Sequence, residues 1–179
     1  MQPDRRMVLA SALAVALSPG LATAHTPFRQ WVVYRQKHLL VGAHRGDAQT
    51  YVLAQAIVVA LGEELPDARA RVARGPRAQR IAKLMSTGQL LLAVLPEAEA
   101  MAMSAAATPF ENYVPISLTR IAAIEADYSL FAAPDLPASH AWLVADALVH
   151  AGLAEEPEDL PIALHPGARA FWRGDPKPG

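Results

Sequence analysis

The sequence contains no cysteine, and this absence excludes disulfide frameworks, thiolate nucleophiles and cysteine-ligated zinc. Aromatic residues make up only 6% of the chain, which leaves few side chains on which nucleic-acid bases could stack. Neither sign of charge dominates, because 16 basic residues face 17 acidic residues and the formal net charge is −1. The chain therefore lacks the electrostatic signature of a nucleic-acid-binding protein, and we expect no nucleic acid among its partners.

Hydrophobic residues, by contrast, make up 53% of the 179 residues, which is ample for a buried core. A disordered chain would have few hydrophobic residues and a large net charge, so the composition predicts a folded protein. A chain of this length buries roughly 70% of the surface that it exposes when unfolded. We therefore expect one compact domain that needs neither a metal nor a disulfide for its stability, and we expect no cofactor.

Residues 1–24 have the pattern of a secretory signal peptide. Arg5 and Arg6 precede an apolar run at residues 8–17, and residues 22–24 form an Ala-Thr-Ala cleavage site. The apolar run is about ten residues long, whereas a membrane-spanning helix needs about 20. We therefore predict cleavage after residue 24 and a periplasmic location. The paired arginines are similar to a twin-arginine signal, and export by the Sec route remains the alternative.

Hydrophobic spacing and turn residues predict alternating strands and helices in the rest of the chain. The predicted strands cover residues 39–41, 70–74, 90–95, 120–124 and 128–132, and the predicted helices cover residues 50–65, 77–87, 97–105 and 140–151. Asp47 and Ser139 are the expected N-caps of the first and last helices. Gly88 and Gly152 are expected to end the second and last helices. This order predicts an α/β fold over residues 25–152, a single three-layer domain with a mostly parallel sheet. Residues 153–179 are rich in proline, and we expect a mostly irregular tail that packs on the domain.

Ligands of open α/β sheets bind beyond the carboxyl ends of the strands, where helices begin. Three segments have this position, namely residues 42–51, 74–79 and 96–99. The first segment is the most suggestive, because two glycines allow close backbone approach and four further side chains can donate to a carboxylate or phosphate. These candidate ligand-binding residues are Gly42, His44, Arg45, Gly46, Thr50 and Tyr51. The alternative is a polar turn without a ligand, since the spacing matches neither a dinucleotide fingerprint nor a P-loop.

Arg74 and Arg77 flank the second segment, and each is either a site residue or an ordinary solvated arginine. A metal site is a separate hypothesis. His25 would become the mature N-terminus, where its imidazole and α-amino group can chelate copper or zinc together with His38 or His44. The alternative for His25 is an ordinary frayed terminus. No serine lies in a Gly-x-Ser-x-Gly elbow and no acid pair has catalytic spacing, so we expect a protein that is not an enzyme.

Several segments together resemble the solute-binding subunits of TAXI-type TRAP transporters (tripartite ATP-independent periplasmic transporters). An opening strand leads through Gly42 to the Thr50 and Tyr51 pair, and residues 88–95 are similar to a later glycine-led strand of that family. Residues 128–148 are similar to the segment that precedes the family's tail. The sequence His-Pro-Gly-Ala at residues 165–168, followed by an aromatic segment at 171–173, is similar to that tail and is the most specific match.

The resemblance implies one lobe of a periplasmic solute-binding protein, in which Gly42, Gly46, Thr50 and Tyr51 face a small anionic solute. It also implies a TRAP-type membrane permease as partner. Family members have two lobes and are about twice as long, so this chain suffices for one lobe, and a second copy in a homodimer would supply the other. Residues 75–79 replace the Ser and Asn of the family's second helix. Two alternatives remain open: a metal-binding accessory protein that uses His25 and His44, and a degenerate lobe that serves as an interaction module without binding a solute.

Overall fold

The structure is a computed structural model that describes residues 37–158 and 161–179. The predicted signal peptide and His25 lie outside the described residues. The described residues all belong to one compact unit. Among them, no helix is both long enough and apolar enough to cross a membrane.

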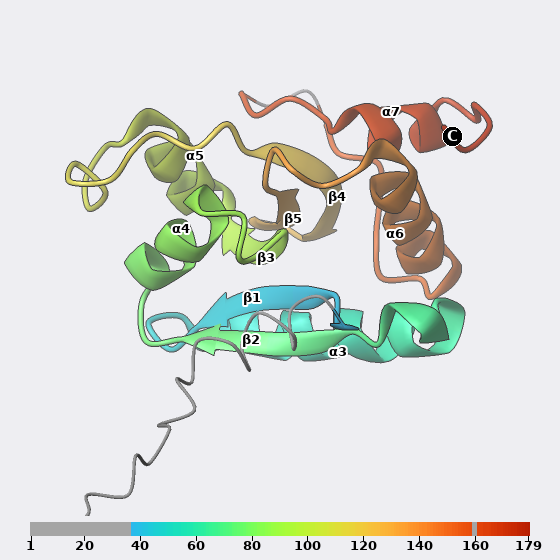
Figure 1. Ribbon diagram of the computed structural model, residues 1–179, viewed down its shortest axis with the longest axis horizontal. Helices are drawn as coiled ribbons and strands as arrows, with labels where there is room; N and C mark the ends of the chain where they lie inside the picture. The colour runs from blue at the N-terminus through green and yellow to red at the C-terminus, as the bar shows by residue number, and fades with distance from the viewer. Residues whose placement is uncertain (1–36, 159–160) are drawn as a thin grey trace, which may run out of the picture. The chain divides into compact units, whose positions relative to one another are not determined.

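Five strands form one mixed sheet in the order β2-β1-β3-β5-β4 (Figure 1). The strands are β1 (Leu40–His44), β2 (Arg71–Gly75), β3 (Leu92–Pro96), β4 (Thr119–Glu125) and β5 (Tyr128–Ala132). β1 pairs in parallel with both β2 and β3, whereas β5 pairs antiparallel with both β3 and β4. The first three strands therefore end at one edge of the sheet, and β5 begins at that same edge.

Helices cover both faces of this sheet. They are α3 (Ala48–Glu64), α4 (Ala78–Ser86), α5 (Glu97–Ala105), α6 (Ala138–His150) and α7 (Pro166–Trp172), with a short 3-10 helix η1 (Pro66–Ala68) after α3. α3 and α6 share one hydrophobic cluster with the sheet, and α4 and α5 share the cluster on the opposite face. α7 packs against α6 and β4. This arrangement confirms the predicted α/β class with three layers.

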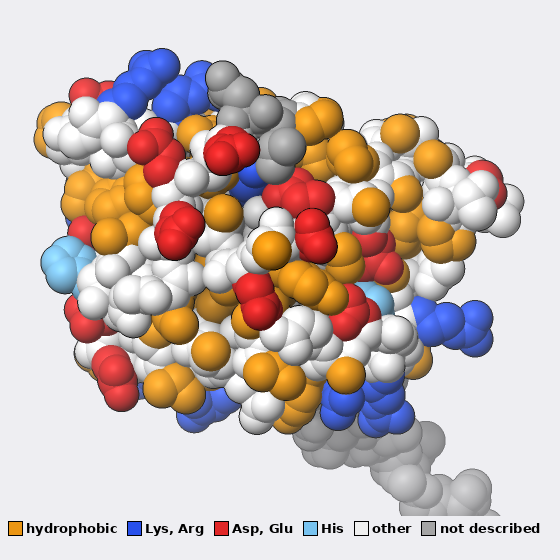
Figure 2. Space-filling model, turned by 180° about the vertical axis from the view of Figure 1, so that it is seen from behind, with side chains coloured by type: hydrophobic (Ala, Val, Ile, Leu, Met, Phe, Trp, Pro, Cys, Tyr) orange, Lys and Arg blue, Asp and Glu red, His pale blue; other side chains and the backbone are white. Residues whose placement is uncertain are grey.

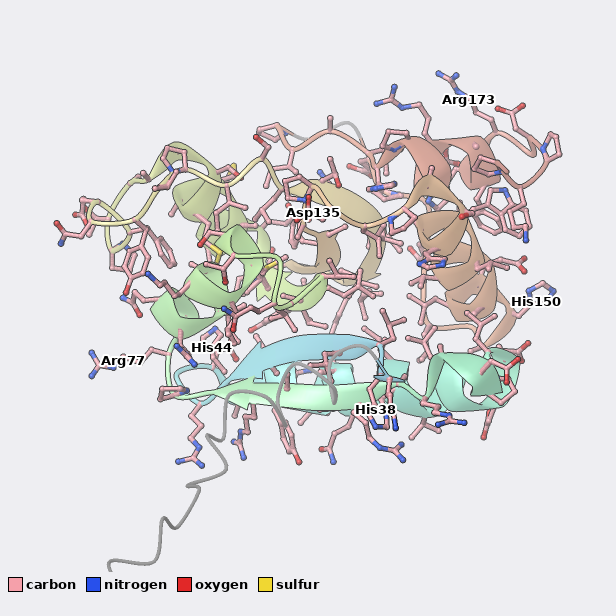
Figure 3. The ribbon with its side chains drawn as sticks, in the orientation of Figure 1. His38, His44, Arg77, Asp135, His150 and Arg173 are labelled. Carbon is pink, nitrogen blue, oxygen red and sulfur yellow. The ribbon has the colours of Figure 1, made fainter. Side chains whose placement is uncertain are left out.

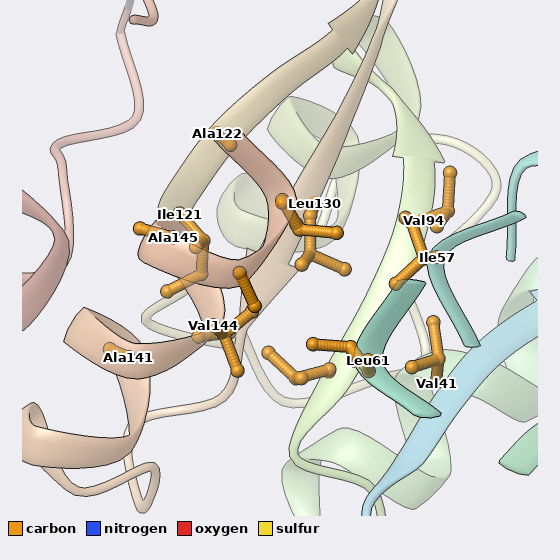
Figure 4. Packing of buried hydrophobic residues seen from close by; sticks show 14 of the residues in the cluster. Val41, Ile57, Leu61, Val94, Ile121, Ala122, Leu130, Ala141, Val144 and Ala145 are labelled. Atoms are coloured by element: carbon orange, nitrogen blue, oxygen red, sulfur yellow. The ribbon is translucent and has the colours of Figure 1, made fainter. Parts of the chain in front are cut away.

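The two hydrophobic clusters follow from the alternation of side chains along the strands. On the first face, Ile57 and Leu61 of α3 meet Val41 and Val94 of the sheet (Figure 4). On the second face, the side chains of α4 and α5 cover the intervening strand positions, among them Leu95. Each strand residue thus contributes to one of two cores, which is why the central strand β3 is an uninterrupted apolar run.

Local signals in the sequence explain where several helices begin and end. The Asp47 side chain accepts a hydrogen bond of 2.9 Å from the backbone N–H of Gln49, which confirms the predicted cap of α3. Gly88 and Gly152 follow α4 and α6 with φ values of +62° and +67°, which confirms both as helix stops.

The structure refines two expectations and corrects one. Four of the five strands run in the same direction, as a mostly parallel sheet requires, but β5 runs antiparallel between β3 and β4, so the sheet is mixed. The described part of the C-terminal tail is mostly irregular, as expected, and it also contains the short helix α7, with Pro166 in its first turn. The expected N-cap Ser139 is wrong, since α6 starts at Ala138 and the carbonyl of Pro137 accepts the first backbone hydrogen bonds, from His140 and Ala141.

Candidate functional site

Two of the predicted ligand-binding segments form one continuous surface at the carboxyl end of the sheet. β1 and β2 end side by side, with His44 opposite Gly75 in the strand register. Just beyond them, the backbone N–H of Arg45 donates a 3.0 Å hydrogen bond to the carbonyl of Gly75. The turn that leads into α3 and the turn that leads into α4 are therefore tied together. We call this surface the β1/β2 edge, made by residues 45–47 and 74–77.

The start of α3 is occupied by the protein's own carboxylate. Besides capping the helix, Asp47 accepts a 2.8 Å hydrogen bond at Oδ2 from the Tyr128 hydroxyl. That hydrogen bond, together with burial and nearby acidic groups, raises the pKa of Tyr128 to about 12. Because a carboxylate already accepts from the first turn of α3, this helix N-terminus does not offer a free anion site.

Thr50 stabilises the same turn through hydrogen bonds from within the domain. Its side chain is fully buried. Its hydroxyl accepts from the backbone N–H of His44 at 3.2 Å and lies 2.8 Å from the carbonyl oxygen of Asp47. Gly42 also lies inside the domain, beneath Leu90. The structure therefore gives both residues a role in shaping the turn and the sheet, and places neither of them at an exposed surface.

Arg45, Arg74 and Arg77 are exposed along the β1/β2 edge. In the part of the chain that the structure describes, no carboxylate forms an ion pair with any of the three. The guanidinium of Arg74 lies over the ring of Tyr51, 4.2 Å from its centroid, and this contact holds it in place. Figure 2 shows basic side chains gathered at the lower right of the molecule, the end at which β1 and β2 lead into their helices.

The first turn of α4 faces this group of arginines. Its N-cap residue is Arg77, and no side chain caps the helix. Without a side-chain cap, the first backbone N–H groups of a helix remain available to water or to a ligand. Figure 3 shows Arg77 projecting from the same end of the molecule as His44. Positive side chains and an uncapped helix start thus coincide at the β1/β2 edge.

His44 lies directly beneath the turn that carries Arg45. Its side chain is 5% exposed, and Nε2 lies 2.9 Å from Oε2 of Glu99 in the first turn of α5. The other ring nitrogen, Nδ1, is buried and has no hydrogen-bond partner. A Cβ added to Gly46 would lie only 3.1 Å from this Nδ1. Gly46, itself exposed, therefore covers the unpartnered nitrogen without a side chain.

A second ion pair, between buried Arg120 and partly exposed Glu97, lies at the first turn of the same helix. Nη1 of Arg120 is 3.5 Å from Oε1 of Glu97, which also accepts a hydrogen bond from Ser129, and Nη2 donates to the carbonyl of Ile162 at 3.3 Å. Burial lowers the pKa of Arg120, and the charge of Glu97 opposes this effect. Glu97 and Glu99 therefore each bind a side chain contributed by a strand, His44 from β1 or Arg120 from β4.

Glu97, Glu99 and Arg120 are not among the site residues predicted from the sequence. Arg120 carries a usable signal, because a charged residue inside an apolar strand segment is buried and needs an opposite charge. The identity of its partner carries no such signal. His44 and Glu99 are 55 residues apart in sequence, and only the pairing of β1 with β3 brings them together.

An open cleft of about 320 Å³ lies elsewhere, between α3, the end of β4 and the segment after α6. It is lined by Gln49, Leu53, Ala56, Ile57, Ile124, Glu125, Gly152, Leu153, Ala154 and Glu155. Nε2 of Gln49 donates to Oε2 of Glu125 at 2.6 Å within this cleft. None of the six predicted ligand-binding residues lines it.

The described residues contain no group of three or more His, Cys, Asp or Glu side chains that could hold a metal ion. His38 makes a 2.9 Å contact through Nδ1 with the carbonyl of Arg69, and His44 contacts Glu99. The metal hypothesis therefore depends on His25, outside the described residues. No protein-family model and no curated protein matches this sequence.

Proposed function

We propose that this protein is a periplasmic, non-enzymatic solute-binding protein that holds a small anion at the β1/β2 edge. One observation carries the proposal: three exposed arginines without carboxylate partners among the described residues surround the uncapped start of α4. Arginine side chains and free helix N–H groups are the donors that bind carboxylates and phosphates in proteins. The resemblance of the sequence to TAXI solute-binding subunits supports the same function.

The proposed site differs from the one expected from the first helix alone. Tyr51 acts through Arg74, whose guanidinium it supports, and Arg77 supplies a second cation from the neighbouring turn. Arg45 joins them because its backbone is hydrogen-bonded to Gly75. The solute is therefore held between the turns that follow β1 and β2, and α4 rather than α3 offers its N-terminus.

The described residues form only one lobe, and this suggests which partners the protein would need. β4 and β5 are joined by the two-residue turn at 126–127, and the described residues contain one five-stranded sheet. Closure around a solute by two lobes would then need a second protein surface. We propose that a second copy of the chain or a TRAP-type permease provides it. Light scattering of the protein with and without a bound anion tests whether two copies of the chain form a dimer.

The test is a thermal-shift and calorimetric screen of the full, exported protein against dicarboxylates, hydroxy acids and inorganic phosphate. A solute present at a hundredfold its Kd stabilises the folded state by about 2.7 kcal/mol, which is readily measured. We expect Arg77→Gln and Tyr51→Leu to weaken binding about tenfold, as the loss of a charge-assisted hydrogen bond does. Arg173→Gln removes an exposed arginine beyond α7 and is the matched control. Binding of none of these anions would overturn the proposal and favour the interaction module.

A further inference from the structure

We propose that the solute carries a hydroxyl group beside its anionic group, and that this hydroxyl donates a hydrogen bond to Nδ1 of His44. The ligand class is then the small hydroxy carboxylates. This inference rests on the proposed function and narrows it. It is carried by a buried ring nitrogen without a partner, lying beneath the turn that carries Arg45.

The hydrogen bond to Glu99 decides which ring nitrogen can accept. A carboxylate only accepts hydrogen bonds, so the Nε2 of His44 that faces Glu99 at 2.9 Å is the protonated nitrogen. In the neutral imidazole, Nδ1 then bears a lone pair and needs a donor.

Because Nδ1 of His44 is buried and cannot be hydrated, a ligand that donates a hydrogen bond to it should bind more tightly than one that does not. In most proteins a buried polar atom has a hydrogen-bond partner, and Nδ1 of His44 has none. A carboxylate oxygen cannot satisfy it, because both groups are acceptors. An ammonium group could donate, but it would approach a surface that already bears Arg45, Arg74 and Arg77. A neutral hydroxyl is therefore the donor that suits this position.

Gly46 provides the approach. It is exposed, and a Cβ built on it would lie 3.1 Å from Nδ1, so the backbone of Gly46 is what separates the buried nitrogen from the surface. A hydroxyl reaches Nδ1 when this turn shifts, and a glycine turn can shift without moving a side chain. Arg45 precedes Gly46 directly, so a carboxylate bound by the arginines has its neighbouring hydroxyl close to the His44 ring.

The experiment compares pairs of acids that differ by one hydroxyl, with malate against succinate and lactate against propionate, by calorimetry on the full, exported protein. We expect the hydroxy acid of a pair to bind about tenfold more tightly, the effect of one added hydrogen bond to a buried acceptor. Equal affinities within the pairs would overturn this inference and leave the proposed function standing. If no anion binds at all, both fail.

A variant separates the role of the ring nitrogen from general damage to the site. Glu99→Gln can donate as well as accept, so Nε2 is no longer held as the donor and the preference for the hydroxyl should fall to about twofold or less. Succinate binding to the same variant is the reference from which this preference is calculated. Glu63→Gln removes the same charge from an exposed position near the end of α3 and should keep the preference.

Nitrogen-15 spectra of the His44 ring supply an independent readout. Nδ1 should be unprotonated in the free protein, and its resonance should shift with malate but not with succinate. A protonated Nδ1 in the free protein would overturn the inference, because the nitrogen could then accept no hydrogen bond from a ligand.

Discussion

Gly42 lies in the middle of β1, where neighbouring side chains close over its α-carbon. A Cβ at this position would lie 2.5 Å from Cδ2 of Leu90 and 3.1 Å from the Cβ of Ala93. Real side chains do not approach so closely, so the sheet and the segment after α4 pack together only because residue 42 has no side chain. This requirement accounts for the glycine without a ligand.

We predict that Gly42→Ala destabilises the fold by about 1–3 kcal/mol, the usual cost of forcing an extra carbon into a packed core. Gly62→Ala is the matched control, because no atom lies within 4 Å of a Cβ at that position of α3. There the substitution should stabilise the helix by about 0.5–1 kcal/mol. Urea denaturation of the two variants measures both effects, and a neutral Gly42→Ala would contradict the packing argument.

Tyr128 illustrates how one hydrogen bond controls an ionisation at the edge of the sheet. Its pKa is raised from 10.0 to about 12, chiefly by the hydrogen bond to Asp47. We predict that a spectrophotometric titration finds one tyrosine that ionises near pH 12, and that Asp47→Asn returns it towards 10. Because the folded-state pKa is the higher one, the associated stability is complete below pH 10 and is lost between pH 10 and 12. Tyr113→Phe should leave this late titration in place.

At the scale of elements, α7 shows how a short helix is held by specific contacts. Nδ1 of His165 accepts from the backbone N–H of Gly167 at 3.1 Å, and Nε2 lies 3.1 Å from the carbonyl of Leu136. A Cβ on Gly167 would lie 1.9 Å from the carbonyl oxygen of Ala138, so α7 meets the start of α6 at backbone distance. The indole of Trp172 donates to the carbonyl of Ile121 in β4 at 3.0 Å.

This cap makes α7 sensitive to acid. Burial lowers the pKa of His165 below its ordinary value of 6.5, and protonation would remove the acceptor at Nδ1. The folded-state pKa is the lower one, so the stability is present above pH 6.5 and is lost as the pH falls through the folded-state pKa. We predict that the protection factors of the α7 amides fall on acidification, when the exchange rate at each pH is compared with the intrinsic rate of the unfolded chain at that pH. His165→Asn, which can still cap the helix, should remove this dependence, and His140→Asn should not. Protection factors in α7 that do not change with pH in the unmodified protein would contradict the prediction.

The sequence predicts most elements because their signals are local. The cap of α3, the glycine stops and the apolar run of β3 need only neighbouring residues to be recognised. The direction of β5 is different, since an apolar strand of five residues has the same pattern whichever way it runs. α7 is not predicted because seven residues in a proline-rich tail show little periodicity, and its stability comes from contacts with α6 and β4.

Some features of the candidate site can be read from the sequence, and others require the three-dimensional fold. The turns after β1 and β2, with Arg45, Arg74 and Arg77, are visible in the sequence as strand ends followed by helix starts. The hydrogen bond that ties these two turns together cannot be read from the sequence, because it depends on the register of β1 against β2. The pairing of His44 with Glu99 likewise requires the three-dimensional fold.

At the scale of the whole molecule, the strand order places β5 between β3 and β4 and brings the turn at 126–127 to the end of the sheet at which β1, β2 and β3 also end. Tyr128 pairs with Pro96 at the end of β3, and the carbonyl of Asp127 accepts a 2.9 Å hydrogen bond from the backbone N–H of Glu97. Ala126 and Asp127 are both exposed. The chain therefore reverses direction at the surface, beside the end of β3 and the start of α5, without passing through the core.

We predict that about ten Gly and Ser residues inserted between Ala126 and Asp127 leave the fold intact and cost about 1.5 kcal/mol, the loop-closure entropy of the longer connection. The same insertion between Leu130 and Phe131, both fully buried in β5, should prevent folding. Circular dichroism and urea denaturation distinguish the two results. Loss of the fold in the first variant would show that the short turn is required to pair β4 with β5.

The exposed turn at 126–127 is a suitable site for inserting a fluorescent reporter protein. A circularly permuted fluorescent protein grafted between residues 126 and 127 would enter and leave at adjacent strands of one rigid sheet, because β4 and β5 are neighbours there. It would stand at the edge where β1, β2 and β3 end, so any change in the turns around a bound anion would reach the chromophore over a short path. The same topology that leaves the described domain with one sheet thus offers an attachment point for a genetically encoded reporter, which would test in cells whether the proposed anion binds.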